Sequence, residues 1–256
     1  MDELSLVIDL HVGNERQGPG ADDETRRAIE LSGVEPDPSL RILDVGCGTG
    51  ASALVLAHVL GGRVTGVDAS ERFVERLRER ADGAGVSGRV DAVVGDMAAL
   101  PFEDGAFDVV WSEGAVYNMG FETGLRAWRR LIRPGGVIGV SELIWTTAER
   151  PAEVEAHWSE EYPGVDTASA KLGQIERAGY RPMGYFVLPG ACWEAEYYEP
   201  IVRALPGFLE RHGHSDAARS IAEGEARERD LYRAYGAWYG YGFFVAGVPI
   251  GAASPG

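Results

Sequence analysis

The chain has 256 residues, of which 45% are hydrophobic, and its formal net charge is −16 at pH 7. This length suits one α/β domain with insertions, and such a domain can bury a sizeable core. Tight binding to a nucleic-acid backbone needs clustered Lys and Arg, whereas Lys171 is the only lysine here, so the composition argues against a nucleic-acid partner.

The sequence gives no sign of a membrane segment, a disulfide framework or a metal site. No apolar run approaches the ~20 residues of a transmembrane helix, and the start Met-Asp-Glu lacks the basic region of a signal peptide. We therefore expect a cytoplasmic protein with no membrane insertion. Cys47 and Cys192 are the only cysteines, and His212-Gly-His214 has no convincing further ligands, so no metal is expected.

The first 40 residues predict two helices, at 2–12 and 22–33, joined by the linker Gln17-Gly-Pro-Gly20. Asp22 is a good N-cap residue, and Gly33 precedes two prolines, which favours a helix end there. Apolar runs then predict strands at 40–45, 63–67, 89–94, 107–111 and 137–142, with helices at 49–60, 70–84 and 123–132 between them. This alternation indicates a doubly wound, mostly parallel sheet.

The first strand leads into a glycine-rich turn. Asp44 lies near the strand's end, Gly46, Gly48 and Gly50 follow, and Asp68 ends the next strand. Ligands of parallel α/β sheets lie outside the carboxyl ends of the strands, where an acid can bind ribose hydroxyls. The spacing also satisfies the dinucleotide fingerprint, so by itself it leaves open a nicotinamide cofactor, another adenosine cofactor or a structural turn.

Further motifs follow in order over residues 40–142, and together they resemble the class I S-adenosylmethionine (SAM) methyltransferases. These motifs are Gly95-Asp-Met-Ala-Ala-Leu-Pro-Phe102, Phe107-Asp-Val-Val-Trp111 and Leu131-Ile-Arg-Pro-Gly-Gly136. Three more segments resemble a bacterial and archaeal small-molecule subgroup that is often labelled ubiquinone/menaquinone-type: residues 15–20, 111–118 and 149–153. The resemblance implies a seven-stranded Rossmann-like sheet and SAM as cofactor.

The second half predicts helices at 148–162 and 167–178 and strands at 185–188 and 239–245. In the resembling family the last two strands form an adjacent antiparallel pair with a short link. Here about 50 residues intervene and predict helices at 197–211 and 215–235. We therefore expect a single domain, 1–256, with an N-terminal helical lid (1–36), a SAM-binding core (37–142), a C-terminal half of the sheet (143–188 and 239–247) and a helical insertion that caps the acceptor (189–238).

The resemblance also implies cofactor contacts. Asp44 and the turn would hold the methionine end, Asp68 with Ala69 the ribose, and Asp96 with Met97 the adenine. Glu113 would face both the methionine moiety and the acceptor, and the lid would fold over the cofactor. The implied set is Gln17, Gly18, Asp44, Gly46, Cys47, Gly48, Gly50, Asp68, Ala69, Asp96, Met97 and Glu113.

The acceptor site is expected around the ends of the fourth and fifth strands and the insertion. Candidate catalytic residues are Glu113, Tyr117 and Glu142, and candidate substrate contacts are Tyr117, Asn118, Trp145, Trp193 and Tyr197. Each has an alternative: the aromatic residues could be core, and Glu142 could pair with a surface arginine. His157 and Tyr198 are further candidates, His157 with a solvated face as its alternative.

These observations predict an enzyme that transfers the methyl group of SAM to a small organic acceptor by in-line displacement, releasing S-adenosylhomocysteine (SAH). A non-catalytic SAM-binding sensor or partner subunit is one alternative, and a nicotinamide-dependent oxidoreductase is another. An aromatic, acidic pocket would suit an amine or a neutral aromatic acceptor better than an anion. The aromatic insertion could also serve as a homodimer contact.

Overall fold

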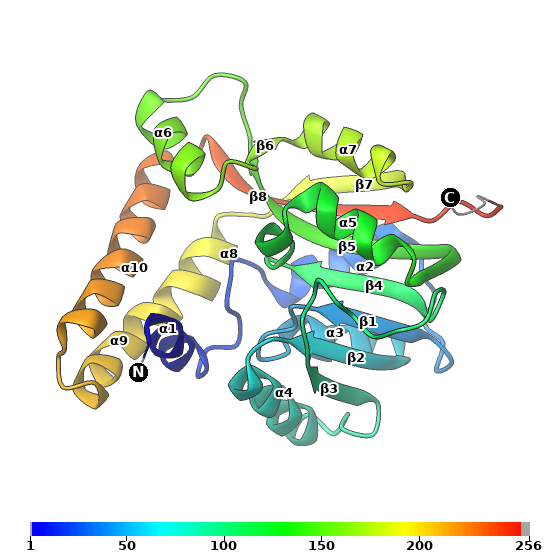
Figure 1. Ribbon diagram of the computed structural model, residues 1–256, viewed down its shortest axis with the longest axis horizontal. Helices are drawn as coiled ribbons and strands as arrows, with labels where there is room; N and C mark the ends of the chain where they lie inside the picture. Colours follow the sequence, from blue (N-terminus) through cyan, green and yellow to red (C-terminus); the bar gives the residue numbers. More distant parts are fainter. Residues whose placement is uncertain (1, 252–256) are drawn as a thin grey trace.

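The computed structural model describes residues 2–251; Met1 and residues 252–256 of the expected domain 1–256 lie outside this range. One mixed sheet runs through the molecule in the order β3-β2-β1-β4-β5-β8-β7, and the short β6 pairs with β5 (Figure 1). Only β8 runs antiparallel to its neighbours β5 and β7. The strands are β1 (Arg41–Val45), β2 (Arg63–Asp68), β3 (Val90–Val94), β4 (Phe107–Glu113), β5 (Ile132–Trp145), β6 (Asp166–Thr167), β7 (Arg181–Val187) and β8 (Tyr239–Gly247).

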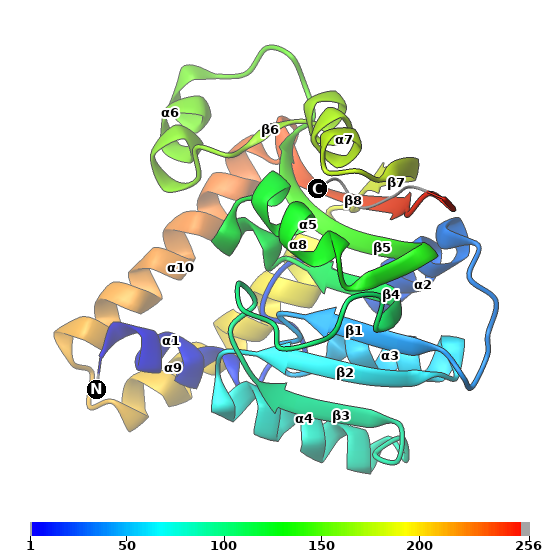
Figure 2. The ribbon, with the colours of Figure 1, turned by 45° about the vertical axis from the view of Figure 1, so that its right-hand side comes forward.

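This arrangement confirms the expected Rossmann-like α/β fold with a mostly parallel sheet. Helices cover both faces, and a further helical group stands at one end of the sheet (Figures 1 and 2). The helices are α1 (Glu3–His11), α2 (Asp22–Ser32), α3 (Ala51–Leu60), α4 (Glu71–Gly83), the 3₁₀ helix η1 (Val116–Met119), α5 (Phe121–Arg129), α6 (Ala152–Glu161), α7 (Ala168–Arg177), α8 (Ala191–Trp193), the π-helix η2 (Glu194–Tyr198), α9 (Glu199–Arg211) and α10 (Asp216–Tyr235).

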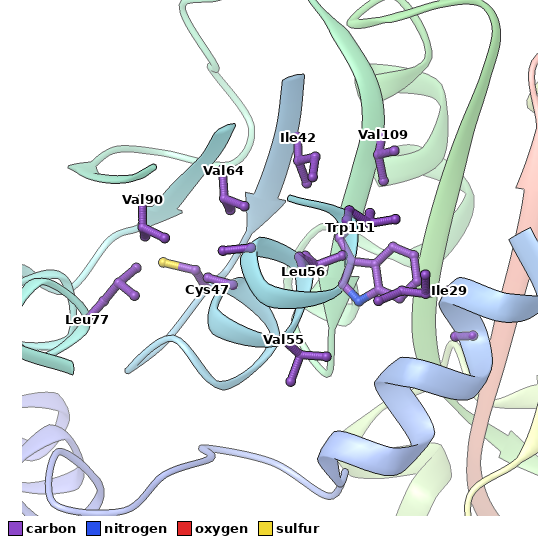
Figure 3. Close-up of a cluster of buried hydrophobic side chains, with 14 of the residues drawn as sticks. Ile29, Ile42, Cys47, Val55, Leu56, Val64, Leu77, Val90, Val109 and Trp111 are labelled. Atoms are coloured by element: carbon purple, nitrogen blue, oxygen red, sulfur yellow. The ribbon is translucent and has the colours of Figure 1, made fainter. Parts of the chain in front are cut away.

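Two hydrophobic cores flank the sheet. On one face α2, α3 and α4 pack on β1, β2 and β4, with Ile42, Val64 and Trp111 fully buried (Figure 3). On the other face α5 and α7 pack on β4 and β5, with Leu125 and Ile138 buried. Strands buried on both faces read as continuous apolar runs, which is why these segments are recognisable in the sequence.

A third core lies at the carboxyl end of β5 and joins segments from both ends of the chain. It holds residues of α1, α6, η2, α9 and α10 together with the ends of β5 and β8. Both views place α1 against α9 and α10 (Figures 1 and 2). Residues 191–211 and 216–235 are helical, and they form a separate cluster at the end of the sheet where parallel strands present ligands.

Several expected boundaries move. β5 starts at Ile132 and ends at Trp145, longer at both ends than expected, since its antiparallel pairing with β8 extends to Trp145. β7 starts at Arg181, and the two-residue β6 was not predicted. The expected lid also divides: α1 packs with α9 and α10, whereas α2 packs with α3 and belongs to a helical layer of the sheet.

Among residues 2–251 we find no helix that combines the length and apolar character needed to cross a membrane.

Candidate functional site

A cavity of about 520 Å³ lies at the carboxyl ends of β1, β2 and β4. Its lining comes mainly from the loop after α1, the glycine turn, the end of β2 with Ala69, the loop after β3 and the end of β4 with the segment that follows it. Twelve of the sequence-predicted residues line it: Gln17, Gly18, Gly46, Cys47, Gly48, Asp68, Ala69, Asp96, Met97, Glu113, Tyr117 and Asn118.

The glycine turn closes one side of this cavity. Gly46, Gly48 and Gly50 have φ of 71°, 53° and 94°, a region that side-chain-bearing residues rarely adopt. A Cβ on Gly48 would lie 2.1 Å from Gln17 Oε1, and one on Gly46 would lie 2.3 Å from Ala115 Cβ. Glycine is therefore required at these positions by backbone conformation and by close approach of the N-terminal loop and the segment after β4.

Asp68 fixes the turn from the neighbouring strand. Gly48 N donates to Asp68 Oδ2 at 2.9 Å, and Ser70 N donates to Oδ1 at 2.9 Å. Burial raises the pKa of this carboxyl group, although the backbone amides oppose the shift. The side chain lies at the cavity wall at the end of β2, where an acid can accept bonds from ribose hydroxyls.

Asp44 lies beneath the turn and does not line the cavity. The residue is fully buried, Ser52 Oγ donates to its Oδ2 at 2.6 Å, and Oδ1 has no hydrogen-bond partner among the described residues. Burial raises the pKa of Asp44 to about 7. Its direct neighbour Ser52 does line the cavity, so Asp44 acts on the site through Ser52 and the turn. Gly50 also lies behind the lining, against Leu77.

Gln17 joins the N-terminal loop to the glycine turn. Its Nε2 donates to Thr49 Oγ1 at 3.1 Å, and its Oε1 accepts from Thr49 N at 2.9 Å. Thr49 Oγ1 also donates to the carbonyls of Asn14 and Glu15. The amide group of Gln17 is thus committed to holding the loop on the turn.

Glu113 ends β4 in a dense set of donors. Arg16 Nη1 donates to its Oε2 at 2.7 Å, and Thr25 Oγ and Trp111 Nε1 donate to its Oε1 at 2.7 and 2.8 Å. Arg16 itself is 8% exposed and also pairs with Asp22. A carboxylate whose two oxygens accept from three side chains is poorly arranged to take a proton from a substrate, so the geometry favours a positioning role.

The loop after β3 forms the far wall. Asp96 lines the cavity and is exposed, and its Oδ1 accepts from Ala98 N at 2.8 Å. Trp128 Nε1 donates to Met97 O at 2.9 Å and so fixes the loop on α5.

Tyr117 and Asn118 stand at the mouth. Tyr117 is 44% exposed and meets Tyr162 edge-on at a centroid distance of 5.9 Å, while Asn118 Nδ2 donates to Ala115 O. Burial raises the pKa of the Tyr117 phenol, and the side chain offers a hydrogen-bond donor and an aromatic face. Its catalytic role stays a prediction.

Glu142 does not line the cavity, and its partner is not a surface arginine. Lys171 Nζ donates to its Oε1 at 3.1 Å, and both residues are 1% exposed. Lys171 Nζ also donates to Gly164 O and lies 4.8 Å from the centroid of the Phe121 ring. This buried pair was not predicted, although a single lysine among apolar neighbours on 168–177 is the signal that could have suggested it.

Trp145, Trp193 and Tyr197, predicted as substrate contacts, are buried in the third core, and their contact with a substrate stays a prediction. Trp145 packs under the Arg150 guanidinium, and Trp193 stacks on Tyr232 at 4.4 Å. All three belong to the third core and are absent from the cavity lining. Burial is favoured because these side chains are large and mostly apolar.

Arg16 is a charged residue of the cavity lining that was not predicted. It lies inside the motif Glu15-Arg-Gln-Gly-Pro-Gly20, which is the signal that could have suggested it. Cys47 is a small side chain buried in the turn, and this burial raises the pKa of its thiol well above the ordinary value. Within residues 2–251 no group of His, Cys, Asp and Glu is placed to hold a metal ion.

The strand order, the glycine turn and the acid at the end of β2 are typical of Rossmann-like α/β folds that bind an adenosine cofactor at the carboxyl ends of the strands. Residues 42–136 match the family model described as "Methyltransferase domain". This segment is therefore similar to methyltransferase domains.

Named relatives match part of the chain. A 27-O-demethylrifamycin SV methyltransferase of Amycolatopsis mediterranei is 36% identical over 134 residues, which are 52% of this chain and 48% of the relative. A sterol 24-C-methyltransferase of Gibberella zeae is 36% identical over 110 residues, 43% of this chain and 29% of the relative. The matches thus span less than half the length of these relatives.

Solved structures match almost the whole chain. The [4+2]-cyclase SpnF has a TM-score of 0.76 and 25% identity, with coverage of 97% of this chain and 93% of that one. A SAM-dependent methyltransferase of Geobacter sulfurreducens in complex with SAH has a TM-score of 0.81 and 22% identity, with coverage of 95% and 96%. These likenesses confirm the fold of the chain from the N-terminal helices to β8.

Proposed function

We propose that this protein binds SAM in the cavity at the ends of β1, β2 and β4 and transfers its methyl group to a small organic acceptor. One observation carries the proposal: the glycine turn, Asp68, Asp96 and Glu113 all line one cavity. These residues lie within the segment that matches the methyltransferase domain.

The cavity suits SAM in its chemistry. The glycine turn brings backbone without side chains at Gly46 and Gly48 to the cavity wall, and Asp68 at the end of β2 presents an acid to ribose hydroxyls. We assign the adenine end to Asp96 and Met97 and the methionine end to the turn, supported from beneath by Asp44. SAM supplies an activated methyl group, so the protein's contribution is alignment of the acceptor and exclusion of water.

The N-terminal loop gives the means to exclude water. Gln17 and Arg16 bind it to the turn and to β4, and Leu4 of α1 reaches the cavity lining. Glu113 then serves as a positioning residue that holds the loop and the end of β4 together. Tyr117 contacts the acceptor with its ring and hydroxyl group, and Asn118 shapes the mouth beside it.

Titration with SAM and with SAH tests this proposal, followed by incubation with a panel of acceptors and measurement of SAH release. Binding of both at sub-millimolar concentration is expected; absence of binding in a folded protein would reject the cofactor site.

A non-transferring role is the second candidate, since a structure that matches nearly the whole chain is that of a [4+2]-cyclase. Conversion of a substrate in the presence of SAM without SAH release would favour that candidate.

The ubiquinone/menaquinone-type subgroup, the homodimer and the cytoplasmic location stay predictions from the sequence. The partial matches to sterol and rifamycin methyltransferases support a small-molecule acceptor more broadly than any one subgroup.

A further inference from the structure

Five consecutive residues of the N-terminal segment, 15–19, line the cofactor cavity, yet none of them belongs to a helix or a strand. A segment without regular structure must find other partners for its buried backbone groups, and those partners decide where it lies. Two of its side chains bind the body of the domain: Gln17 binds Thr49, and Arg16 binds Glu113. A further contact comes from α4 and holds the backbone of the segment itself.

Arg80, in the last turn of α4, makes this contact. Its Nη1 donates to Glu15 O at 2.9 Å and to Thr49 O at 3.0 Å, so one guanidinium group bridges the N-terminal segment and the glycine turn. The same nitrogen lies 3.2 Å from Thr49 Oγ1. Hydrogen bonds from a charged donor are stronger than those between neutral groups, and Arg80 is partly buried, which reduces their screening by salt.

α4 is a firm support for this arginine because the helix packs directly on the turn. A Cβ on Gly50 would lie 2.2 Å from Leu77 Cδ1, and Leu77 is fully buried. Leu77 and Arg80 are three residues apart and therefore share one face of the helix. The same helix also holds α1, since Arg72 Nη2 lies 2.8 Å from Asp9 Oδ1. The N-terminal segment is thus attached to α4 at α1 and again at the cavity wall.

The contacts of the segment converge on the hydroxyl group of Thr49, which is fully buried. Four atoms lie within hydrogen-bond distance of its Oγ1: Asn14 O at 3.0 Å, Glu15 O at 2.9 Å, Gln17 Nε2 at 3.1 Å and Arg80 Nη1 at 3.2 Å. A hydroxyl group offers one donor and two acceptor sites, so the capacity of Thr49 is fully used. Three of the four partners belong to the N-terminal segment.

Neither Thr49 nor Arg80 belongs to the cavity lining. Both are therefore placed to act on a ligand through the segment that they hold. If the hydroxyl or the guanidinium group is removed, the carbonyls of Asn14 and Glu15 lose partners, and an unsatisfied buried acceptor is costly. The segment can recover hydrogen bonds from water only by moving away from the turn, and this movement opens the cavity wall.

We propose that Thr49 and Arg80 are positioning residues for the cofactor: together they hold residues 15–19 against the glycine turn, and the affinity for SAM depends on this contact. The inference rests on the proposed function, because it takes SAM as the ligand of the cavity, whereas the position of the segment can be measured without SAM. By linkage, a ligand that binds better when the segment lies on the turn must also stabilise the segment in that position.

Trypsin reports the position of the segment. Arg16 is 8% exposed, so cleavage after it requires the segment to leave the turn, and mass spectrometry follows the release of fragment 1–16 from the full chain. Thr49→Val keeps the shape of the side chain without its hydroxyl group. This variant and Arg80→Met should both release the fragment about tenfold or more faster than the parent protein. Saturation of the parent protein with SAH should slow the release.

Calorimetry measures the affinity of the same variants for SAH. Thr49→Val and Arg80→Met should each bind SAH about fivefold or more weakly than the parent protein, and Thr49→Ser, which has a hydroxyl group, should recover most of the lost affinity. Arg76→Met is the matched control, because Arg76 is an exposed arginine of the same helix that pairs with Glu79, and it should match the parent protein in both assays. Thermal melts show which variants are folded, and Arg80→Met decides the matter if Thr49→Val is not.

The outcomes separate the two proposals. Failure of the parent protein to bind SAH rejects the proposed function, whatever the rate of cleavage. If the parent protein binds SAH and the folded variants bind it equally well, the present inference alone is overturned. Weaker binding with unchanged cleavage after Arg16 also overturns it, because the loss would not act through the segment. Equal losses in Arg76→Met would overturn it as well, since a change in the charge of α4 would then explain them.

Discussion

Arg16 Nη1 lies 2.7 Å from Glu113 Oε2, and this contact joins the loop after α1 to the end of β4 across the mouth of the cofactor cavity. Both side chains are largely buried, with exposures of 8% and 11%. A buried ion pair is expensive to break from one side, because the remaining charge stays desolvated. Because both residues line the cavity, the position of the N-terminal segment should affect the binding of a ligand there.

Removal of Arg16 should therefore damage both stability and cofactor binding. Arg16→Met leaves Glu113 without its cation and is expected to lower the free energy of unfolding by about 3–5 kcal/mol. The double variant Arg16→Met/Glu113→Gln should recover part of this loss, since no uncompensated charge remains. Denaturant titration measures the stabilities, and an additive double variant would show that the two side chains do not act as a pair.

Asp68 gives a sharper test of the cofactor site. Asp68→Ala should weaken SAH binding by about 1–3 kcal/mol, because hydrogen bonds to the ribose are lost. Asp91→Ala on the exposed side of β3 is the control and should bind SAH as the parent protein does. Calorimetry gives both affinities, and unchanged binding in folded Asp68→Ala would reject the ribose assignment.

Gly48 tests the close approach of the N-terminal loop to the turn. Gly48→Ala requires a side chain at φ 53° and places its Cβ 2.1 Å from Gln17 Oε1, so the loop must move. We expect SAH affinity to fall by about tenfold or more. Gly88→Ala has open space around its Cβ and serves as control. Equal affinities for the two variants would show that the loop adapts without loss.

The Glu142–Lys171 pair beneath the acceptor side should respond like other buried pairs. Lys171→Met should lower the free energy of unfolding by about 3–5 kcal/mol, and adding Glu142→Leu should restore much of it. If Lys171→Met alone is as stable as the parent protein, the pair is not the buried ion pair that its 3.1 Å separation indicates.

The fold and most of the cofactor wall could be predicted because they depend on local signals. Buried parallel strands read as apolar runs, and positive φ at Gly46 and Gly48 leaves few residues other than glycine. The short β6 and the full length of β5 depend on pairing between distant segments, which the local pattern does not encode.

The acceptor side was harder to predict because its chemistry depends on tertiary partners. Large aromatic residues such as Trp193 and Trp145 looked like pocket walls but are core, since only packing decides which rings meet solvent. Conversely, Arg16 and Glu228 look like ordinary surface charges in the sequence, and Lys171 differs from one only in its apolar neighbours. Their burial, and the pairing of Arg16 and Lys171 with acids of the sheet, appear only when the sheet brings distant segments together.

Stability should decrease as the pH rises from about 5 to about 8. Glu228 has an ordinary pKa of 4.5 that burial raises to about 7, so between these values the folded chain binds more protons than the unfolded chain. Its stabilising contribution is complete below the unfolded pKa and is lost as the pH rises through the folded pKa. Asp44, whose pKa is also raised to about 7 by burial, adds in the same direction.

Glu228→Gln removes one of these groups and should be more stable than the parent protein at pH 8 by on the order of 1–3 kcal/mol, with a smaller difference at pH 5. Urea titrations of the parent protein, Glu228→Gln and the exposed control Glu223→Gln at both pH values measure this, and a pH dependence that Glu228→Gln leaves unchanged would show that Glu228 ionises without penalty in the folded chain.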